Sequence, residues 1–299
     1  MAAVPSFTIC DCEGREGHVG VDPLAPLPGR PSLGPLKTDL SPALRATLLR
    51  WVETQLLPTQ AGDRVLAVAT ALDIPLLDAF ADEDVIGSLE YFWRESDGQL
   101  LDVVHATLHV LANSGIVFRP PQPYEEVEKH LALGRSVWQA TATGLVRRVE
   151  AATQAALEWT TMTADAASAE LKEAWEKATS REGDPSDAWD HAIKAVEAVL
   201  IPIVVPTQVG PHLGHVLGQL DRHGQLWEPG LRYNQTKPPD SSPRSPVEAL
   251  VGVLRLIYPN PDRHVGPGHR TPTAAEARVV VQLAMTVVQW AREGLIVKR

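Results

Sequence analysis

The sequence predicts a mainly helical protein with one small β-hairpin, and three observations support this class. Beyond residue 40, apolar residues recur at intervals of three and four, which is the spacing of one buried helix face. Several of these segments begin with Ser, Thr or Asp, followed by Pro or by Glu three residues later, as helix starts typically do. Only one short stretch, near residue 140, alternates like paired strands.

Residues 1–40 are rich in Pro and Gly and have little periodicity, so we expect an irregular N-terminal arm. The arm contains both cysteines of the chain, Cys10 and Cys12, one residue apart. We interpret them as free thiols, because two such cysteines make no disulfide framework. A metal site that also used His18 would lack a fourth ligand at a familiar spacing.

Residues 41–150 are predicted to form a helical sensing or partner domain. Ser41-Pro42 is typical of a helix start, and Leu44, Leu48 and Val52 continue it at helical spacing. A hairpin is predicted over residues 136–149, with its turn near Thr143-Gly144. The alternative, a helix that already begins at Leu145, stays open. Further helices are expected over residues 82–95, 100–112 and 124–133.

Residues 151–299 are predicted to form a second helical domain. Between residues 151 and 180 the pattern is helical, with Trp159, Leu171 and Trp175 expected in the core. The β-branched residues Thr160, Thr161 and Thr163 are expected to divide this stretch into two helices.

Four further helices are expected between residues 184 and 294. Asp184-Pro185 starts the first, and Ser245 and Thr273 each stand three residues before a Glu in a capping-box pattern. A shorter helix is expected over residues 213–220, followed by a Pro-rich loop over residues 229–243. We expect one core that buries Trp189, Leu217, Leu254 and Val287.

Charge and hydropathy narrow the function classes. The formal net charge is −10, and an acidic surface repels phosphate backbones, so non-specific coating of DNA is disfavoured. From residue 261 onward, however, six basic residues stand against three acidic ones. The chain begins without the pattern of a signal peptide, and its most apolar stretch is too short to span a bilayer. We therefore expect a cytoplasmic protein that does not enter a membrane.

The segment of residues 260–270 contains the densest group of side chains that could take part in catalysis or anion binding. Asp262, Arg263, His264, His269 and Arg270 lie there beside flexible glycines, just before a helix start. Arginine grips phosphate with its planar fork, and histidine moves protons near neutral pH. This combination favours metal-free phosphodiester chemistry, with no cofactor and no metal, and the alternative is a solvated loop between helices.

Other polar residues offer weaker candidates. Asp102, His105 and His109 share one helical face and could bind zinc, but a polar stripe is the simpler interpretation. His212 and His215, with His223 further on, could also bind a metal, and the alternative is that they belong to a packing helix. Glu197 lies in an apolar helix and needs a partner, for which Arg263 and Lys194 are the candidates. The chain has no Walker loop, G-x-G-x-x-G, G-x-S-x-G or H-E-x-x-H motif.

Four runs follow one another in the C-terminal part: residues 190–199 (DHAIKAVEAV), 212–220 (HLGHVLGQL), 250–257 (LVGVLRLI) followed by Asp262-Arg263-His264, and 276–278 (EAR) with 283–290 (LAMTVVQW). In order and spacing they resemble the C-terminal domain of abortive-infection proteins, a family related to the HEPN (higher eukaryote and prokaryote nucleotide-binding) domains. The resemblance covers roughly residues 175–299.

The resemblance implies a phage-defence protein that binds RNA or cleaves it as a metal-independent endoribonuclease. Arg263 would hold the scissile phosphate, and His269 or His264 would transfer the proton; which histidine acts stays open. Glu197 and Asp262 are expected to support these residues. HEPN sites pair across a dimer, so we expect a homodimer with Arg263 near its two-fold axis and an unknown phage or host trigger. The alternative is a non-catalytic module for dimerisation or partner binding, which a phage could also encode.

Overall fold

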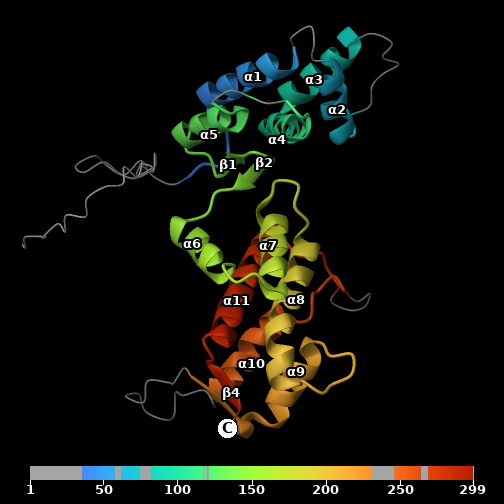
Figure 1. Ribbon diagram of the computed structural model, residues 1–299. Helices are drawn as coiled ribbons and strands as arrows, with labels where there is room; N and C mark the ends of the chain where they lie inside the picture. The colour runs from blue at the N-terminus through green and yellow to red at the C-terminus, as the bar shows by residue number, and fades with distance from the viewer. Residues whose placement is uncertain are drawn as a thin grey trace, which may run out of the picture.

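A computed structural model describes residues 36–57, 62–74, 82–116, 118, 121–230, 246–263 and 269–298 of the protein. Within these residues it has eleven α-helices and two small antiparallel sheets, which confirms the mainly helical class. Buried apolar side chains form two separate clusters, one between Leu40 and Leu145 and one between Leu157 and Ile296. Figure 1 shows the two halves that these clusters fill. None of the helices described is long and apolar enough to cross a membrane.

The N-terminal half is built around one central helix, α4. It contacts α1, α2, α3 and the second strand of the hairpin, and nearly every turn of it is buried. Ser41 caps α1 as predicted, because its hydroxyl accepts a hydrogen bond from the Leu44 amide. Helix α2 is not among the helices that the sequence pattern predicts. The bounds are α1 Pro42–Leu56, α2 Gly62–Ala71, α3 Asp82–Glu95, α4 Asp97–Asn113 and α5 Pro123–Leu133.

The predicted hairpin is present, with β1 over Trp138–Thr141 and β2 over Gly144–Arg147. The following helix, α6, covers Ala151–Thr160 and ends at the predicted threonine run. The expectation that Trp159 is a core anchor is wrong, because this side chain is 62% exposed. The helix is only ten residues long, and its buried residues are Leu157 and Thr160.

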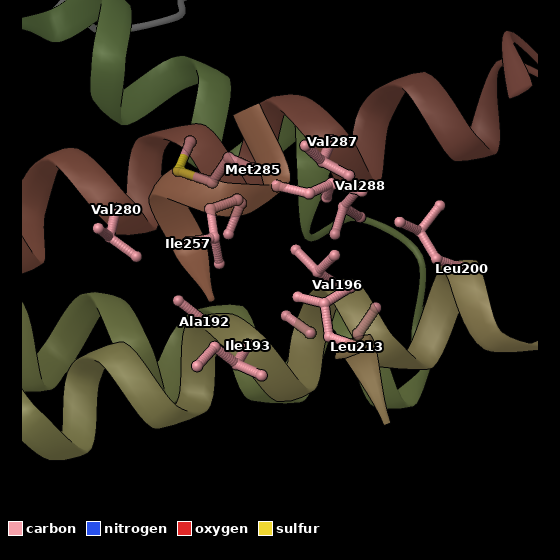
Figure 2. Close-up of a cluster of buried hydrophobic side chains, with 14 of the residues drawn as sticks. Ala192, Ile193, Val196, Leu200, Leu213, Ile257, Val280, Met285, Val287 and Val288 are labelled. Carbon is pink, nitrogen blue, oxygen red and sulfur yellow. The ribbon is translucent and has the colours of Figure 1, made fainter. Parts of the chain in front are cut away.

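The C-terminal half is a helical bundle in which α7, α8 and α11 pack against one another, while α9 and α10 cover one end (Figure 1). Figure 2 shows its core, where Val196 of α8 lies across from Val287 and Val288 of α11 and Ala192 lies nearer to Val280. The strands β3 and β4 pair below the bundle. The bounds are α7 Ala166–Thr179, α8 Pro185–Val204, α9 Leu213–Arg222, η1 Gly224–Leu226, β3 Trp227–Pro229, α10 Pro246–Ile257, α11 Ala274–Arg292 and β4 Ile296–Lys298.

The four helices expected between residues 184 and 294 are α8, α9, α10 and α11, so this prediction is confirmed. Trp189, Leu254 and Val287 are buried in one core as expected, and Leu217 is half-buried against it. Trp189 also donates its indole N–H to the Ile257 carbonyl at 2.6 Å, which satisfies its polar atom inside the core. Cys10, Cys12, His18, Ser245, His264 and most of the Pro-rich loop lie outside the described residues.

Candidate functional site

The connection from α10 to α11 holds most of the residues that the sequence singles out. We call its described residues, 258–263 and 269–273, the α10–α11 corner. Within it, Asp262 and His269 lie together, with His269 Nε2 3.0 Å from Asp262 Oδ1. The His269 side chain is 41% exposed, so it can reach a bound molecule. His264, the other candidate histidine, lies outside the described residues.

Buried Asn260 fixes the shape of this corner. Only 2% of its surface is exposed. Its Nδ2 lies 3.0 Å from the Ser186 carbonyl and 3.1 Å from Asp190 Oδ1, both on α8. Its Oδ1 accepts the Asp262 amide at 3.0 Å, and its carbonyl accepts the Arg263 amide at 3.2 Å. The first turn of α8 therefore determines where Asp262 and Arg263 lie.

Sequence reasoning placed Asn260 in the corner but did not find this role. The Asn260-Pro261 pair marks a turn, and that signal was available. The partners Ser186 and Asp190 lie about seventy residues earlier in the chain, so only the fold reveals them.

Arg263 is exposed, and its side chain makes no hydrogen bond or ion pair with another described residue. Among the described residues, no acceptor occupies its guanidinium, whose donors suit an anion. The backbone beside it is fixed by the hydrogen bond to Asn260, so the free charge sits at the end of an ordered turn.

Arg270 differs from Arg263 because it is already paired. Both of its terminal nitrogens lie 2.8 Å from the carboxylate oxygens of Glu276. Glu276 also accepts the Thr273 amide at 2.8 Å, and Thr273 accepts the Glu276 amide, which confirms the predicted capping box of α11. The Arg270 guanidinium, together with the Thr273 donors, lowers the pKa of Glu276 to about 2. Arg263 and His269 are therefore the remaining candidates for binding an anion at the corner.

Glu197 does not have the partner that was expected. Its Oε1 accepts a hydrogen bond from the Leu213 amide at 2.7 Å. The partners expected from the sequence were Arg263 and Lys194. Leu213 is the first residue of α9, where backbone amides lack acceptors within the helix. Glu197 therefore joins α8 to α9 and is not a support for Arg263, which corrects the sequence-based expectation.

The other histidine candidates have structural partners. Asp102 pairs with Arg181 at 2.6 Å, and His105 Nδ1 accepts the Leu145 amide at 2.9 Å. His212 caps α9 by accepting the Gly214 amide. In the part of the chain that the structure describes, no three His, Cys, Asp or Glu side chains are grouped to hold a metal ion.

The corner combines a histidine that can transfer protons with an exposed arginine on the same turn. His269 Nε2 lies 3.0 Å from Asp262 Oδ1, close enough for the carboxylate to stabilise a charged imidazole ring. Such a histidine can take a proton from a hydroxyl, because the charged ring that results lies beside a carboxylate. Arg263 supplies positive charge on the same turn.

Comparison with protein-family models, with curated proteins and with solved structures finds no match to this chain.

Proposed function

We propose that the C-terminal half is a HEPN-like domain that binds RNA, or cleaves it without a metal ion, in phage defence. The observation that carries this proposal is the Asp262–His269 pair at 3.0 Å, in the same corner as Arg263, which is exposed and is paired with none of the described residues. The order of motifs along residues 175–299, which resembles the abortive-infection C-terminal family, supplies the functional class.

The proposed reaction uses the 2′-hydroxyl of RNA as the nucleophile. His269 takes the hydroxyl proton as the 2′-oxygen attacks the adjacent phosphorus, and the P–O5′ bond breaks. The leaving 5′-oxygen takes a proton from an acid, so the products are a 2′,3′-cyclic phosphate and a 5′-hydroxyl. Arg263 binds the phosphate, where negative charge builds up in the transition state. In a homodimer two such corners would face each other, and the second would supply the acid.

The N-terminal half is proposed to receive the trigger, from a phage or a host component. We also propose that the protein lies in the cytoplasm and forms a dimer with Arg263 near the two-fold axis. Light scattering at tens of micromolar tests the dimer: a monomer at that concentration would contradict the two-chain site.

The decisive experiment is cleavage of single-stranded RNA in EDTA, with 2′-deoxy strands of the same sequence as substrate control. We expect RNA products with 2′,3′-cyclic ends and intact DNA, which lacks the nucleophile. His269→Ala should cost roughly 10²–10⁴-fold in rate, as removal of a general acid or base typically does. Arg263→Ala should be at least as damaging, and His264→Ala tells which histidine acts.

Arg50→Ala is the matched control, because Arg50 is also exposed and lies on α1, far along the chain from the corner. It makes the same change of charge and should leave cleavage unchanged. Cleavage that disappears in EDTA, or that persists fully in Arg263→Ala, rules out the mechanism.

A second function is favoured by a specific observation. Several polar side chains of the corner have structural partners: Asn260 binds α8, Asp262 lies against His269, and Arg270 pairs with Glu276. Such a corner could serve a non-catalytic dimerisation or partner-binding module. RNA that stays intact under all conditions, with the dimer still formed, would support this alternative.

A further inference from the structure

The loop between α7 and α8 connects the two halves of the molecule. Its first residue, Ser180, forms an antiparallel bridge with Val146 of β2. The next residue, Arg181, donates its amide to the Leu145 carbonyl at 3.0 Å. The loop thus adds a short stretch of backbone to the hairpin of the N-terminal half (Figure 1).

The side chain of Arg181 strengthens this connection. Its Nε lies 2.6 Å from Asp102 Oδ1, and a terminal nitrogen donates to the Gly98 carbonyl at 2.8 Å, both on α4. The guanidinium also lies over the Trp138 ring, 5.0 Å from its centre. Only 14% of the Arg181 side chain is exposed, so solvent screens this ion pair less than a surface pair.

The same loop leads directly into the residues that hold the corner. Asp184 caps α8 by accepting the amides of Ser186 and Asp187. Ser186 then provides the carbonyl and hydroxyl oxygens that lie at 3.0 and 3.2 Å from Asn260 Nδ2. Five positions along the chain therefore separate the ion pair with the N-terminal half from the contact with Asn260.

The loop has little freedom to absorb a movement. A Cβ atom added at Gly183 would lie 1.9 Å from the Lys177 carbonyl oxygen, far inside any allowed contact. The Gly183 amide also bonds to the Ser180 carbonyl at 3.2 Å. Because the loop is pressed against the end of α7, a displacement at Arg181 is passed to the start of α8.

We propose that residues 180–186 couple the N-terminal half to the α10–α11 corner, with Asn260 as the residue that positions Asp262 and Arg263. A ligand or partner of the N-terminal half that changes the contacts of Arg181 would then change the corner. That the corner is the active site rests on the proposed function, whereas the coupling is a property of the fold and can be measured without RNA.

Hydrogen–deuterium exchange of the free protein tests the coupling. The readout is the amides of Asp262 and Arg263, which are protected only while Asn260 holds the corner. In Arg181→Gln and in Gly183→Ala we expect these amides to exchange roughly tenfold faster. This corresponds to a decrease of about 1.4 kcal/mol in the free energy of local opening. Arg181→Lys, which keeps the charge, should restore part of the protection.

Arg292→Gln is the matched control. Arg292 is similarly buried, pairs with Asp165 at 2.6 Å and bonds to Ser168, at the opposite end of α11 from the corner. It weakens the same bundle without touching the loop, so the corner amides should keep their exchange rates. If Arg181→Gln does not fold, Asp102→Asn removes the same ion pair and leaves the loop sequence intact.

Coupling between two sites acts equally in both directions. Asn260→Ala should therefore speed exchange of the Arg181 amide, which bonds to Leu145 across the junction. Unchanged corner amides in Arg181→Gln, or equal acceleration in Arg292→Gln, would overturn the proposal. Neither result depends on RNA cleavage. The exchange experiment therefore tests the coupling, and the cleavage assay tests the proposed function separately.

Discussion

His105 and Leu145 join α4 to β2 through one buried hydrogen bond, in which His105 Nδ1 accepts the Leu145 amide at 2.9 Å. A nitrogen that accepts cannot carry a proton, so the neutral ring has its proton on Nε2, 3.8 Å from Glu182 Oε2. Protonation of Nδ1 would break the bond to Leu145. The histidine is 8% exposed and has to stay neutral to hold the hairpin in place.

The first prediction follows from that bond. Burial lowers the pKa of His105 below its usual value of 6.5, and the nearby Glu182 opposes this only in part. Below pH 6.5 the unfolded chain then binds more protons than the folded one, so the free energy of unfolding should fall as the pH drops from 7 to 5. His105→Asn keeps an acceptor but cannot be charged, so urea unfolding should show a weaker pH dependence.

The control for this prediction is His109→Asn on the same helix. His109 is exposed, its ring lies 3.3 Å from Asn113 Nδ2, and its influence on the pKa of His105 is the smallest of several, so its replacement should leave most of the pH dependence of the wild type. An equal loss of pH dependence in both variants would contradict the role given to His105.

The second prediction concerns Gly144, against which the same ring packs. An added Cβ would lie 2.6 Å from His105 Cε1, and the φ of +148° is one that side chains rarely adopt. Gly144→Ala should therefore lower the free energy of unfolding by roughly 1–3 kcal/mol. Gly252 in α10 is the opposite case, because an added Cβ meets nothing within 4 Å. Gly252→Ala should stabilise the protein by about 0.5–1 kcal/mol.

The sequence predicted the elements whose signals are local. Ser41 before Pro42 and Thr273 before Glu276 mark helix starts because the capping atoms lie within three residues of the amides they bind. The hairpin turn at Gly144 is local for the same reason. The sequence could not predict that Glu197 accepts the Leu213 amide, because a single carboxylate in an apolar helix could bind any of several groups.

The candidate site was predicted in composition but not in geometry. Asp262 and His269 meet because the corner turns back on itself, and that turn depends on Asn260 and the distant Ser186. Arg181 gave no sequence signal at all, since its partners Asp102 and Trp138 become neighbours only through tertiary packing. Trp159 failed for a related reason: helical spacing cannot tell which side of a short helix faces the core.

The third prediction concerns the hydrogen bonds that Asn260 donates to α8. Asn260→Ala leaves the Asp262 amide and the α8 acceptors without their partner, and should cost about 1–3 kcal/mol in the free energy of unfolding. Asn260→Asp, of nearly the same size, puts a second carboxylate beside Asp190 and should cost at least as much. Asn113→Ala, at the exposed end of α4, should change stability by less than about 0.5 kcal/mol. Equal effects at both asparagines in urea unfolding would exclude a special role for Asn260.

The last prediction separates stability from RNA binding at Glu276. Because Arg270 and Thr273 hold the pKa of this carboxyl at about 2, its contribution to stability is present above the unfolded value of 4.5 and is lost as the pH falls toward 2. Glu276→Gln removes that contribution at every pH, so the melting temperature at pH 7 should fall and its acid dependence should flatten.

The same substitution releases Arg270, which is otherwise bound to both oxygens of Glu276. If the corner binds RNA, Glu276→Gln should bind it more tightly, and the slope of log K against log salt should steepen by about 0.7 for one added phosphate contact on a single strand. Arg270→Ala in the native background should change RNA affinity little, because the paired guanidinium makes no phosphate contact. The double variant Arg270→Ala with Glu276→Gln should return to the native slope. A weaker affinity in Glu276→Gln would mean that the capping of α11, and not the number of free arginines, controls RNA binding at the corner.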